Sequence, residues 1–128
     1  MSEERIPPAP PITPESAPFY EAAATGRFLL RRCTDCGRAH WYPRTLCPFC
    51  FGSTAWQEAS GRGVIYSYSV VRRATPPFAI AYVTLDDGPT MMTNLVGCDF
   101  DALAIGQRVR LAFRASDGGA PVPCFTPE

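Results

Sequence analysis

Lysine is absent from the chain, histidine occurs once, and no apolar run approaches the length of a membrane-spanning helix. The twelve cationic residues are all arginines and balance twelve acidic residues, so the formal net charge of the 128-residue chain at pH 7 is zero. Nucleic-acid binders owe much of their affinity to positive charge that neutralises phosphates, which argues against a dedicated nucleic-acid binder. A membrane helix needs about 20 apolar residues, and the N-terminus lacks the pattern of a signal peptide. We therefore expect a soluble, cytoplasmic protein that does not bind membranes.

Proline and charge divide the chain into three segments. Six of the fourteen prolines lie within residues 1–18, which predicts an extended arm because proline fixes φ and lacks an amide proton. The net charge is −3 over residues 1–26 and +3 over residues 27–60, and it balances over residues 61–128. We predict a Pro-rich arm with a short helix in the first segment, a zinc ribbon in the second and an OB-fold barrel in the third. The Met1 start and the arm lead us to expect a complete chain rather than a domain cut from a fusion.

Apolar periodicity predicts mostly strands, with one short helix near the N-terminus. The helix is expected over residues 19–25, because Pro18 suits its first turn and Gly26 suits the positive-φ position after its end. Strands are predicted over residues 28–30, 56–58, 64–71, 79–85, 90–96, 107–115 and 122–125. The strands after residue 61 are of the number and length that build a small barrel.

Four of the six cysteines form the strongest motif, Cys33-x-x-Cys36 followed by Cys47-x-x-Cys50. Two such pairs at this separation are typical of a zinc ribbon, in which each pair supplies two thiolates to one tetrahedral Zn²⁺. Disulfides are disfavoured in a cytoplasmic chain, and a thioredoxin-type redox site would use a single pair. Rubredoxin-type iron is a chemical alternative to zinc. Four cysteine ligands leave no open coordination position, so the metal is predicted to be structural and not catalytic.

The remaining chemistry-bearing residues form no convincing catalytic group. His40 is expected at the surface or beside the metal ligands, because no serine or carboxylate stands at a suggestive spacing from it. Cys98 and Cys124 fit the role of small buried residues. The aspartates lie in turn contexts, where Asp is common for backbone reasons. We therefore expect no activity from the chain alone.

Several short motifs follow the arm in a fixed order. They are Pro18-Phe19-Tyr20, Gly26-Arg27-Phe28-Leu29, the four-cysteine segment with Tyr42-Pro43-Arg44, Ser60-Gly61-Arg62-Gly63, the segment from Ala79 to Gly88, and Ile105-Gly106-Gln107-Arg108-Val109. In this order, over residues 14–128, the chain resembles the zinc-ribbon plus OB-fold family of acyl-CoA-associated accessory proteins, long classed as a domain of unknown function. Phe51 departs from the family pattern, which usually has glycine directly after the last cysteine of the ribbon.

The resemblance implies a mainly β fold with a short N-terminal helix, in which a rubredoxin-like zinc ribbon precedes an OB-fold barrel. Family members are typically non-catalytic partners of thiolase-superfamily enzymes: thiolases, hydroxymethylglutaryl-CoA synthases, or aldolases that release steroid side chains from CoA thioesters. Some are fused or coupled to a MaoC-type hydratase. The resemblance therefore implies structural zinc and a thiolase-like partner that supplies the catalytic residues. It also implies an acyl-CoA ester, shared with the partner, whose binding site or channel the chain helps to form.

Candidate contact residues follow from what a CoA ester and a protein partner require. A CoA ester needs cations for its phosphates and an apolar groove for its pantetheine and acyl parts. The candidates for substrate or CoA contact are the cations Arg72, Arg73, Arg108 and Arg110 and the apolar residues Pro77 and Phe78. These residues could instead form only a solvated strand face and loop. Aromatic residues around the ribbon exceed what a metal site can bury, which predicts a protein-facing patch. The candidates for partner contact are Phe19, Tyr20, Trp41, Tyr42 and Phe51.

A module that binds single-stranded nucleic acid is the main rival, because zinc ribbons and OB barrels both serve that role. Tyr66 and Tyr68 could stack bases, and the arginine face that ends in Arg114 could attract phosphates. The zero net charge argues against this rival, as does an alternation that places both tyrosines beside Val64 and Val70 in the predicted core. The residues also leave open a self-sufficient enzyme and a purely structural adaptor.

Overall fold

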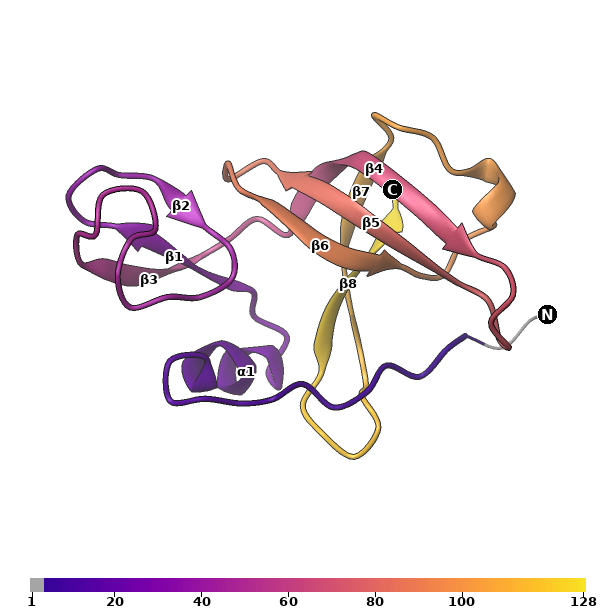
Figure 1. Cartoon of the computed structure of the whole chain (residues 1–128), viewed down its shortest axis with the longest axis horizontal. Helices are drawn as coiled ribbons and strands as arrows, with labels where there is room; N and C mark the ends of the chain where they lie inside the picture. Colours follow the sequence, from indigo (N-terminus) through magenta and orange to yellow (C-terminus); the bar gives the residue numbers. More distant parts are fainter. Residues whose placement is uncertain (1–3) are drawn as a thin grey trace.

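The computed structural model describes residues 4–128, which form one short helix and two β-sheets (Figure 1). The helix α1 spans Ala17–Ala23, with Pro18 in its first turn, and the chain leaves it through Gly26 at φ +81°. It lies two residues earlier than the predicted 19–25, because a turn at Thr13 already supplies the first hydrogen bond, from the Ala17 amide to the Thr13 carbonyl at 2.8 Å. A helix this short is stable only when it packs against other elements.

The ribbon is a three-stranded antiparallel sheet in the order β2-β1-β3. Its strands are β1 (Leu29–Cys33), β2 (Ala39–His40) and β3 (Thr54–Glu58). The segments predicted over residues 28–30 and 56–58 correspond to β1 and β3, and each strand is longer than expected. The short strand β2 was not predicted, because two residues between turns carry no periodicity.

A closed five-stranded barrel follows, in the order β4-β5-β6-β8-β7. Its strands are β4 (Arg62–Val71), β5 (Phe78–Leu85), β6 (Thr90–Leu95), β7 (Arg108–Arg114) and β8 (Val122–Pro127), and the short 3-10 helix η1 (Phe100–Ala102) lies between β6 and β7. Neighbouring strands are antiparallel except β6 and β8, which are parallel where Leu95 pairs with Phe125. The predicted fold class, a zinc ribbon followed by an OB-like barrel with a short N-terminal helix, is confirmed.

A β-bulge in β4 changes which residues face the barrel interior. The register of β4 against β5 shifts between Ile65 and Ser67, which makes Tyr66 the extra residue. Ile65 is therefore buried, whereas Tyr66 is 67% exposed, and the prediction of Tyr66 in the core is wrong. Tyr68 follows the bulge and packs partly against the core, with its hydroxyl donating to the Leu103 carbonyl at 2.9 Å.

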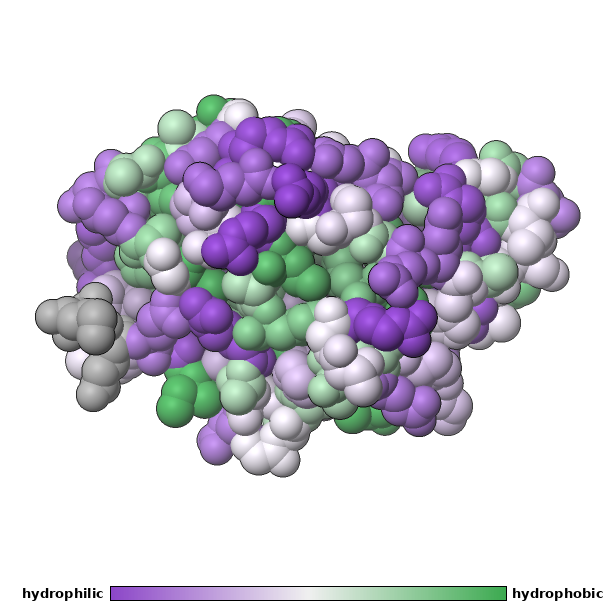
Figure 2. All heavy atoms as spheres, turned by 180° about the vertical axis from the view of Figure 1, so that it is seen from behind, coloured by the Kyte–Doolittle hydropathy of each residue, from purple (hydrophilic) through white to green (hydrophobic). Residues whose placement is uncertain are grey.

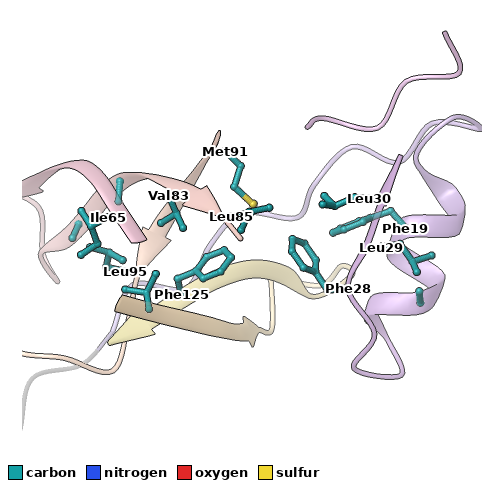
Figure 3. Packing of buried hydrophobic residues seen from close by; sticks show 14 of the residues in the cluster. Phe19, Phe28, Leu29, Leu30, Ile65, Val83, Leu85, Met91, Leu95 and Phe125 are labelled. Carbon is teal, nitrogen blue, oxygen red and sulfur yellow. The ribbon is translucent and has the colours of Figure 1, made fainter. Parts of the chain in front are cut away.

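One continuous hydrophobic core joins the helix, the ribbon and the barrel. Phe28 lies directly before β1 and points toward Phe125 of β8 (Figure 3), with 6.3 Å between their ring centroids. Phe19 of α1 is fully buried and packs edge-on against Phe28 and Trp41, at centroid distances of 6.0 and 5.1 Å. Apolar packing of this kind fixes the ribbon relative to the barrel.

The surface carries both apolar areas and hydrophilic side chains. On one face, apolar side chains gather near the middle and are framed by hydrophilic ones (Figure 2). The exposed large apolar residues are Ile6, Ile12, Tyr42, Leu46, Phe49, Phe51, Tyr66, Tyr82, Met92 and Ile105. Within residues 4–128, no helix has the length and apolar character that crossing a membrane requires.

Candidate functional site

The four cysteine sulfurs of the two C-x-x-C pairs lie together in the ribbon, all within 4.8 Å of one another. The Cys33 and Cys50 sulfurs are 3.5 Å apart, and the Cys36 and Cys47 sulfurs are 3.7 Å apart. A tetrahedral Zn²⁺ with Zn–S bonds of about 2.3 Å places its sulfur ligands about 3.8 Å from one another. The spacing and the chemistry of the four thiols therefore fit structural zinc.

Backbone amides in the ribbon turns point at the cysteine sulfurs. The amides of Asp35 and Cys36 donate to the Cys33 sulfur at 3.3 and 3.2 Å, and the Phe49 amide donates to the Cys47 sulfur at 3.4 Å. The Cys36 amide is the main reason why the pKa of the Cys33 thiol falls from 9.0 to about 6. Because the thiolate is the form that binds metal, the turn prepares Cys33 to act as a ligand.

Phe51 adopts the left-handed conformation that glycine usually supplies after the last cysteine, with φ +64°. Its amide donates to the Cys47 carbonyl at 2.9 Å, as the amide of Gly37, at φ +77°, donates to the Cys33 carbonyl at 3.1 Å in the first turn. The two turns therefore have the same hydrogen bond and the same backbone conformation. A non-glycine residue in this conformation costs roughly 1 kcal/mol or more. Since the Phe51 side chain is 78% exposed, packing within residues 4–128 offsets little of that cost.

Phe51 belongs to a group of exposed apolar residues in the loop between β2 and β3, which also carries Cys47 and Cys50, and we call this group the ribbon patch: Tyr42, Leu46, Phe49 and Phe51. Their exposed fractions are 37%, 56%, 49% and 78% in that order. The guanidinium of Arg38 lies over the Phe49 ring at 3.5 Å from its centroid, which adds a cation beside the apolar surface.

Two of the five predicted partner contacts are buried. Phe19 and Tyr20 have exposed fractions of 0% and 6%, because α1 packs both side chains into the shared core. The structure therefore corrects their assignment as partner contacts. The Tyr20 hydroxyl lies 3.1 Å from the Tyr42 hydroxyl. Trp41 is partly buried against the core, whereas Tyr42 and Phe51 are exposed.

The residues predicted to contact substrate or CoA lie in two separate regions. Arg72, Pro77 and Phe78 line a cavity of about 680 Å³ beside the barrel, and the neighbouring Arg73 is exposed outside that lining. This volume is in the range of small-molecule sites. The structure thus brings three of the six predicted residues together.

The other two predicted cations, Arg108 and Arg110, do not line this cavity. Arg108 makes two hydrogen bonds of 2.9 Å to the carboxylate of Asp86, which lowers the pKa of that carboxyl. Arg110 lines a second hollow of about 310 Å³, beside Arg27. They form a charged strand face instead of one site with Arg72.

The large cavity is walled by the N-terminal arm, the loop between β4 and β5, the segment from β6 to η1, and parts of β7 and β8. Both cysteines outside the ribbon line it. Burial raises the pKa of the Cys124 thiol to about 11, and it also raises the pKa of Cys98. Both thiols are therefore uncharged near neutral pH and contribute to the apolar part of the wall.

Sequence reasoning missed Glu4 and Gly97 at this cavity, and it named Arg114 only as part of an arginine strand face with Arg108 and Arg110. The alternation of apolar and polar residues along the strand assigns Arg114 to a polar face, but it does not show that the strand ends at a cavity. No local signal marks Glu4 or Gly97, because their contact joins the arm to a loop far along the chain.

His40 is buried at 3% exposure, so of the two positions expected for it, at the surface or beside the metal ligands, the surface position is wrong. Within residues 4–128, neither ring nitrogen has a hydrogen-bond partner. Burial is the main cause that lowers the pKa of His40. The charges of Arg44 and Arg31 lower it further, whereas the Arg44 carbonyl and Glu15 oppose the shift. His40 is therefore a neutral, buried ring next to the ribbon.

Two family models match adjacent parts of the chain. The rubredoxin-like zinc ribbon domain of ChsH2 matches residues 21–57, and the C-terminal OB-fold domain of ChsH2 matches residues 56–114. A solved structure described as an Ltp2-ChsH2(DUF35) aldolase is similar with a TM-score of 0.79 and 33% identity, covering 92% of this chain and 98% of that chain.

Two curated proteins are also similar to this chain. The probable enoyl-CoA hydratase alpha subunit of Thermomonospora curvata is 35% identical over 127 residues, which cover 94% of this chain. The chain spans only 40% of the length of that relative. A DUF35 domain-containing scaffold protein of Methanothermobacter thermautotrophicus is 34% identical over 91 residues, which cover 65% of this chain and 68% of that protein.

Proposed function

Since this chain belongs to the DUF35 family, whose ChsH2-type members join a zinc ribbon to an OB-fold, we propose that it is a cytoplasmic, non-catalytic accessory subunit of an acyl-CoA-processing enzyme. The proposed partner is a thiolase-superfamily enzyme of the thiolase, hydroxymethylglutaryl-CoA synthase or steroid side-chain aldolase type. The scaffold name of one relative and the aldolase name of the similar structure support an accessory role beside an enzyme. The hydratase name of another relative supports a MaoC-type hydratase as a further component.

The ribbon patch is the observation that carries this proposal. Monomeric proteins seldom keep several large apolar side chains exposed in one short loop, and such groups mark protein interfaces. Phe51 keeps its exposed ring at a position where glycine would avoid the backbone cost. A residue that is strained and exposed is best explained by a contact with another molecule. We therefore assign Tyr42 and Phe51, with Leu46 and Phe49, to the partner interface.

Zinc held by Cys33, Cys36, Cys47 and Cys50 has a structural role in this proposal. A metal bound to four thiolates fixes the loop that carries the ribbon patch, and metal binding supplies about 10–16 kcal/mol to the folding of small zinc modules. The partner enzyme would supply the catalytic residues.

The cavity beside the barrel is the proposed place of contact with the acyl part of a CoA ester. Pro77 and Phe78 form an apolar edge, and Arg72 stands at the same edge, paired with Asp101 at 2.7 Å. Arg73, in the same loop, is placed to meet a phosphate outside the cavity. Arg108 and Arg110 lie outside this region, and they are proposed only as secondary phosphate contacts.

A pull-down tests the accessory role. The tagged chain is expressed together with a thiolase-type aldolase subunit, and the co-eluting enzyme is quantified. The native chain is expected to retain the enzyme, and Phe51→Gly is expected to retain at least fivefold less while remaining folded. Ile105→Ala serves as the matched control, because Ile105 is also an exposed apolar residue, at 71%, but lies on the barrel. Equal retention by Phe51→Gly and the native chain would contradict the assignment of the patch, and no retention of any thiolase-type subunit would contradict the accessory role.

Binding of single-stranded nucleic acid stays a second candidate because of one observation. Tyr66 and Tyr82 are exposed at 67% and 47% on neighbouring barrel strands, where they could stack bases. The zero net charge still argues against it. A salt-sensitive mobility shift of a labelled single-stranded oligonucleotide, lost in Tyr66→Ala, would favour this candidate.

A further inference from the structure

The N-terminal arm closes one side of the large cavity. Glu4, Arg5 and Pro7 all belong to its lining. The Arg5 guanidinium lies over the Phe78 ring at 4.4 Å from its centroid, and the Pro7 carbonyl accepts from the Asp117 amide at 2.9 Å. The arm is thus attached at several points along the cavity.

The carboxylate of Glu4 occupies a small anion site inside this wall. One carboxylate oxygen accepts from the Gly97 amide, and the other accepts from Arg114 Nε at 3.1 Å. Gly97 has φ +63°, and a Cβ there would lie 3.2 Å from Arg114 Nη2 and 3.3 Å from Thr126 Oγ1. The absence of a side chain at Gly97 therefore leaves room for the guanidinium. An amide and a guanidinium that hold both oxygens of one carboxylate are recognition chemistry for a carboxylate in general.

The contacts of Gly97 and Arg114 with the Glu4 carboxylate are weak enough for another carboxylate to replace it. The side chains of Arg114 and Glu4 are 37% and 46% exposed, so water and salt screen their attraction. The arm is linked to the rest of the chain beyond this point by the contacts of Pro7 and by a β-bridge between Pro8 and Asp117. Residues 4–6 can therefore leave the site while the arm stays attached at Pro7.

The cavity next to this anion site presents more apolar than polar surface, and the charged residues Arg5, Arg72, Asp99 and Asp101 also line it. Phe78, Leu95 and Phe100 contribute carbon surface, together with the uncharged thiols of Cys98 and Cys124. An apolar wall that adjoins one carboxylate site matches a molecule with an apolar body and one terminal carboxylate.

We propose that the cavity binds such a carboxylate, and that Glu4 occupies the head-group site until the ligand displaces it. This inference rests on the proposed function for its use of the cavity and deepens it by adding a free carboxylate to the apolar acyl part, since the thioester end of an acyl-CoA carries none. It concerns the chain alone, so ligand binding and retention of a partner enzyme can fail independently.

Titration of the full-length chain with decanoate by isothermal calorimetry tests the inference. The native chain is expected to bind decanoate weakly. Glu4→Gln is expected to bind it about tenfold more tightly, because the competing carboxylate is gone. Adding Arg114→Met to Glu4→Gln should lower that affinity at least tenfold. Arg62→Met, which removes a cation of the barrel outside this cavity, should have no effect when added to Glu4→Gln.

Two further measurements separate displacement of the arm from other effects. Decanoate should speed tryptic cleavage after Arg5 in the native chain, because the ligand releases residues 4–6, whereas decanol should not. The inference would be overturned by the absence of saturable decanoate binding in Glu4→Gln, or by equal affinities in Glu4→Gln with and without Arg114. It would also be overturned if CoA without an acyl group bound to Glu4→Gln while decanoate did not.

Discussion

Phe51 and His40 both hold a side chain where another residue would cost less free energy. Phe51 has a positive φ with an exposed ring, and His40 buries two ring nitrogens without hydrogen-bond partners among residues 4–128. Residues of this kind are informative, because the rest of the fold must offset their cost and because they cluster at functional sites. Each leads to a prediction that a single substitution can test.

Phe51→Gly is expected to leave the free energy of unfolding unchanged or to raise it by roughly 1 kcal/mol, because glycine adopts the left-handed conformation without steric cost. Urea unfolding followed by circular dichroism measures this. Gly37 occupies the equivalent position of the first turn, and Gly37→Ala is the reverse control, expected to destabilise the ribbon. A loss of more than about 1 kcal/mol in Phe51→Gly would show that the ring stabilises the isolated chain.

His40→Leu is expected to change how stability depends on pH. Burial lowers the pKa of His40, so below its ordinary value of about 6.5 the unfolded chain binds more protons than the folded chain. The free energy of unfolding of the native chain should therefore fall as the pH decreases from about 7 through the lowered pKa. The leucine variant lacks this loss, so its stability relative to the native chain should be greater at about pH 5.5 than at about pH 7.5. Urea titrations at both pH values check this, and a constant difference between the two proteins would contradict it.

Sequence reasoning reached some of these residues and not others, for physical reasons. The four cysteines could be predicted because a metal site imposes a fixed local spacing. The ion pair between Glu4 and Arg114 could not be predicted, because it joins residues far apart in the chain and no local pattern marks it. Tyr66 was misplaced because a bulge inserts one residue and reverses the alternation.

At the level of elements, the ribbon depends on both metal and core. Its strands β1 and β3 pair over five positions, but β2 pairs with β1 over only two. The long loop between β2 and β3 carries Cys47 and Cys50 and has few backbone hydrogen bonds of its own, so a metal would hold it in place. The strand pattern was predictable for β5 and β6, where side chains alternate, and not for β2, whose two residues are too few to show a period.

Cys47→Ser is expected to remove most of the bound zinc and to unfold the loop between β2 and β3. The loss of a thiolate ligand weakens a site whose metal contributes on the order of 10 kcal/mol to folding. Zinc content per chain, measured by mass spectrometry, should fall well below one, and hydrogen exchange should speed up in the loop first. Cys98→Ser is the matched control and should keep its zinc, since Cys98 lies at the barrel cavity. Equal zinc content in the two variants would refute the metal assignment.

For the whole molecule, the shared core means that the ribbon and the barrel support each other. Phe28 contacts Phe125 of the barrel and both Phe19 and Trp41 on the helix and ribbon side. The segment boundaries at residues 26 and 60 stay predictions. The shared core includes residues from all three segments. The boundaries therefore mark changes in charge and motif, and we expect that the segments do not fold independently.

Phe28→Ala is expected to lower the free energy of unfolding by about 3–5 kcal/mol, because it removes a large buried ring from the centre of the shared core. It should also uncouple the two parts. Both tryptophans, Trp41 and Trp56, lie in the ribbon segment, so fluorescence reports on the ribbon while circular dichroism is dominated by the barrel strands. The two unfolding curves should coincide in the native chain and separate in the variant. Coincident curves in the variant would show that contacts other than Phe28 join the two parts.

The pairing of β6 with β8, which is parallel, differs from the pairing of every other two neighbouring strands of the barrel. Leu95 and Phe125 are its one register pair, next to a 2.9 Å hydrogen bond from the Val96 amide to the Phe125 carbonyl. Every other neighbouring pair of barrel strands is antiparallel with three or more paired positions. Leu95 and Val96 also line the large cavity. Separating these two strands would part fewer paired positions than separating any other neighbouring pair of barrel strands, and it would move Leu95 and Val96 of the cavity wall. The largest molecule that the cavity can bind would then depend on how easily β6 and β8 separate, and not on the volume of the cavity while the two strands are paired.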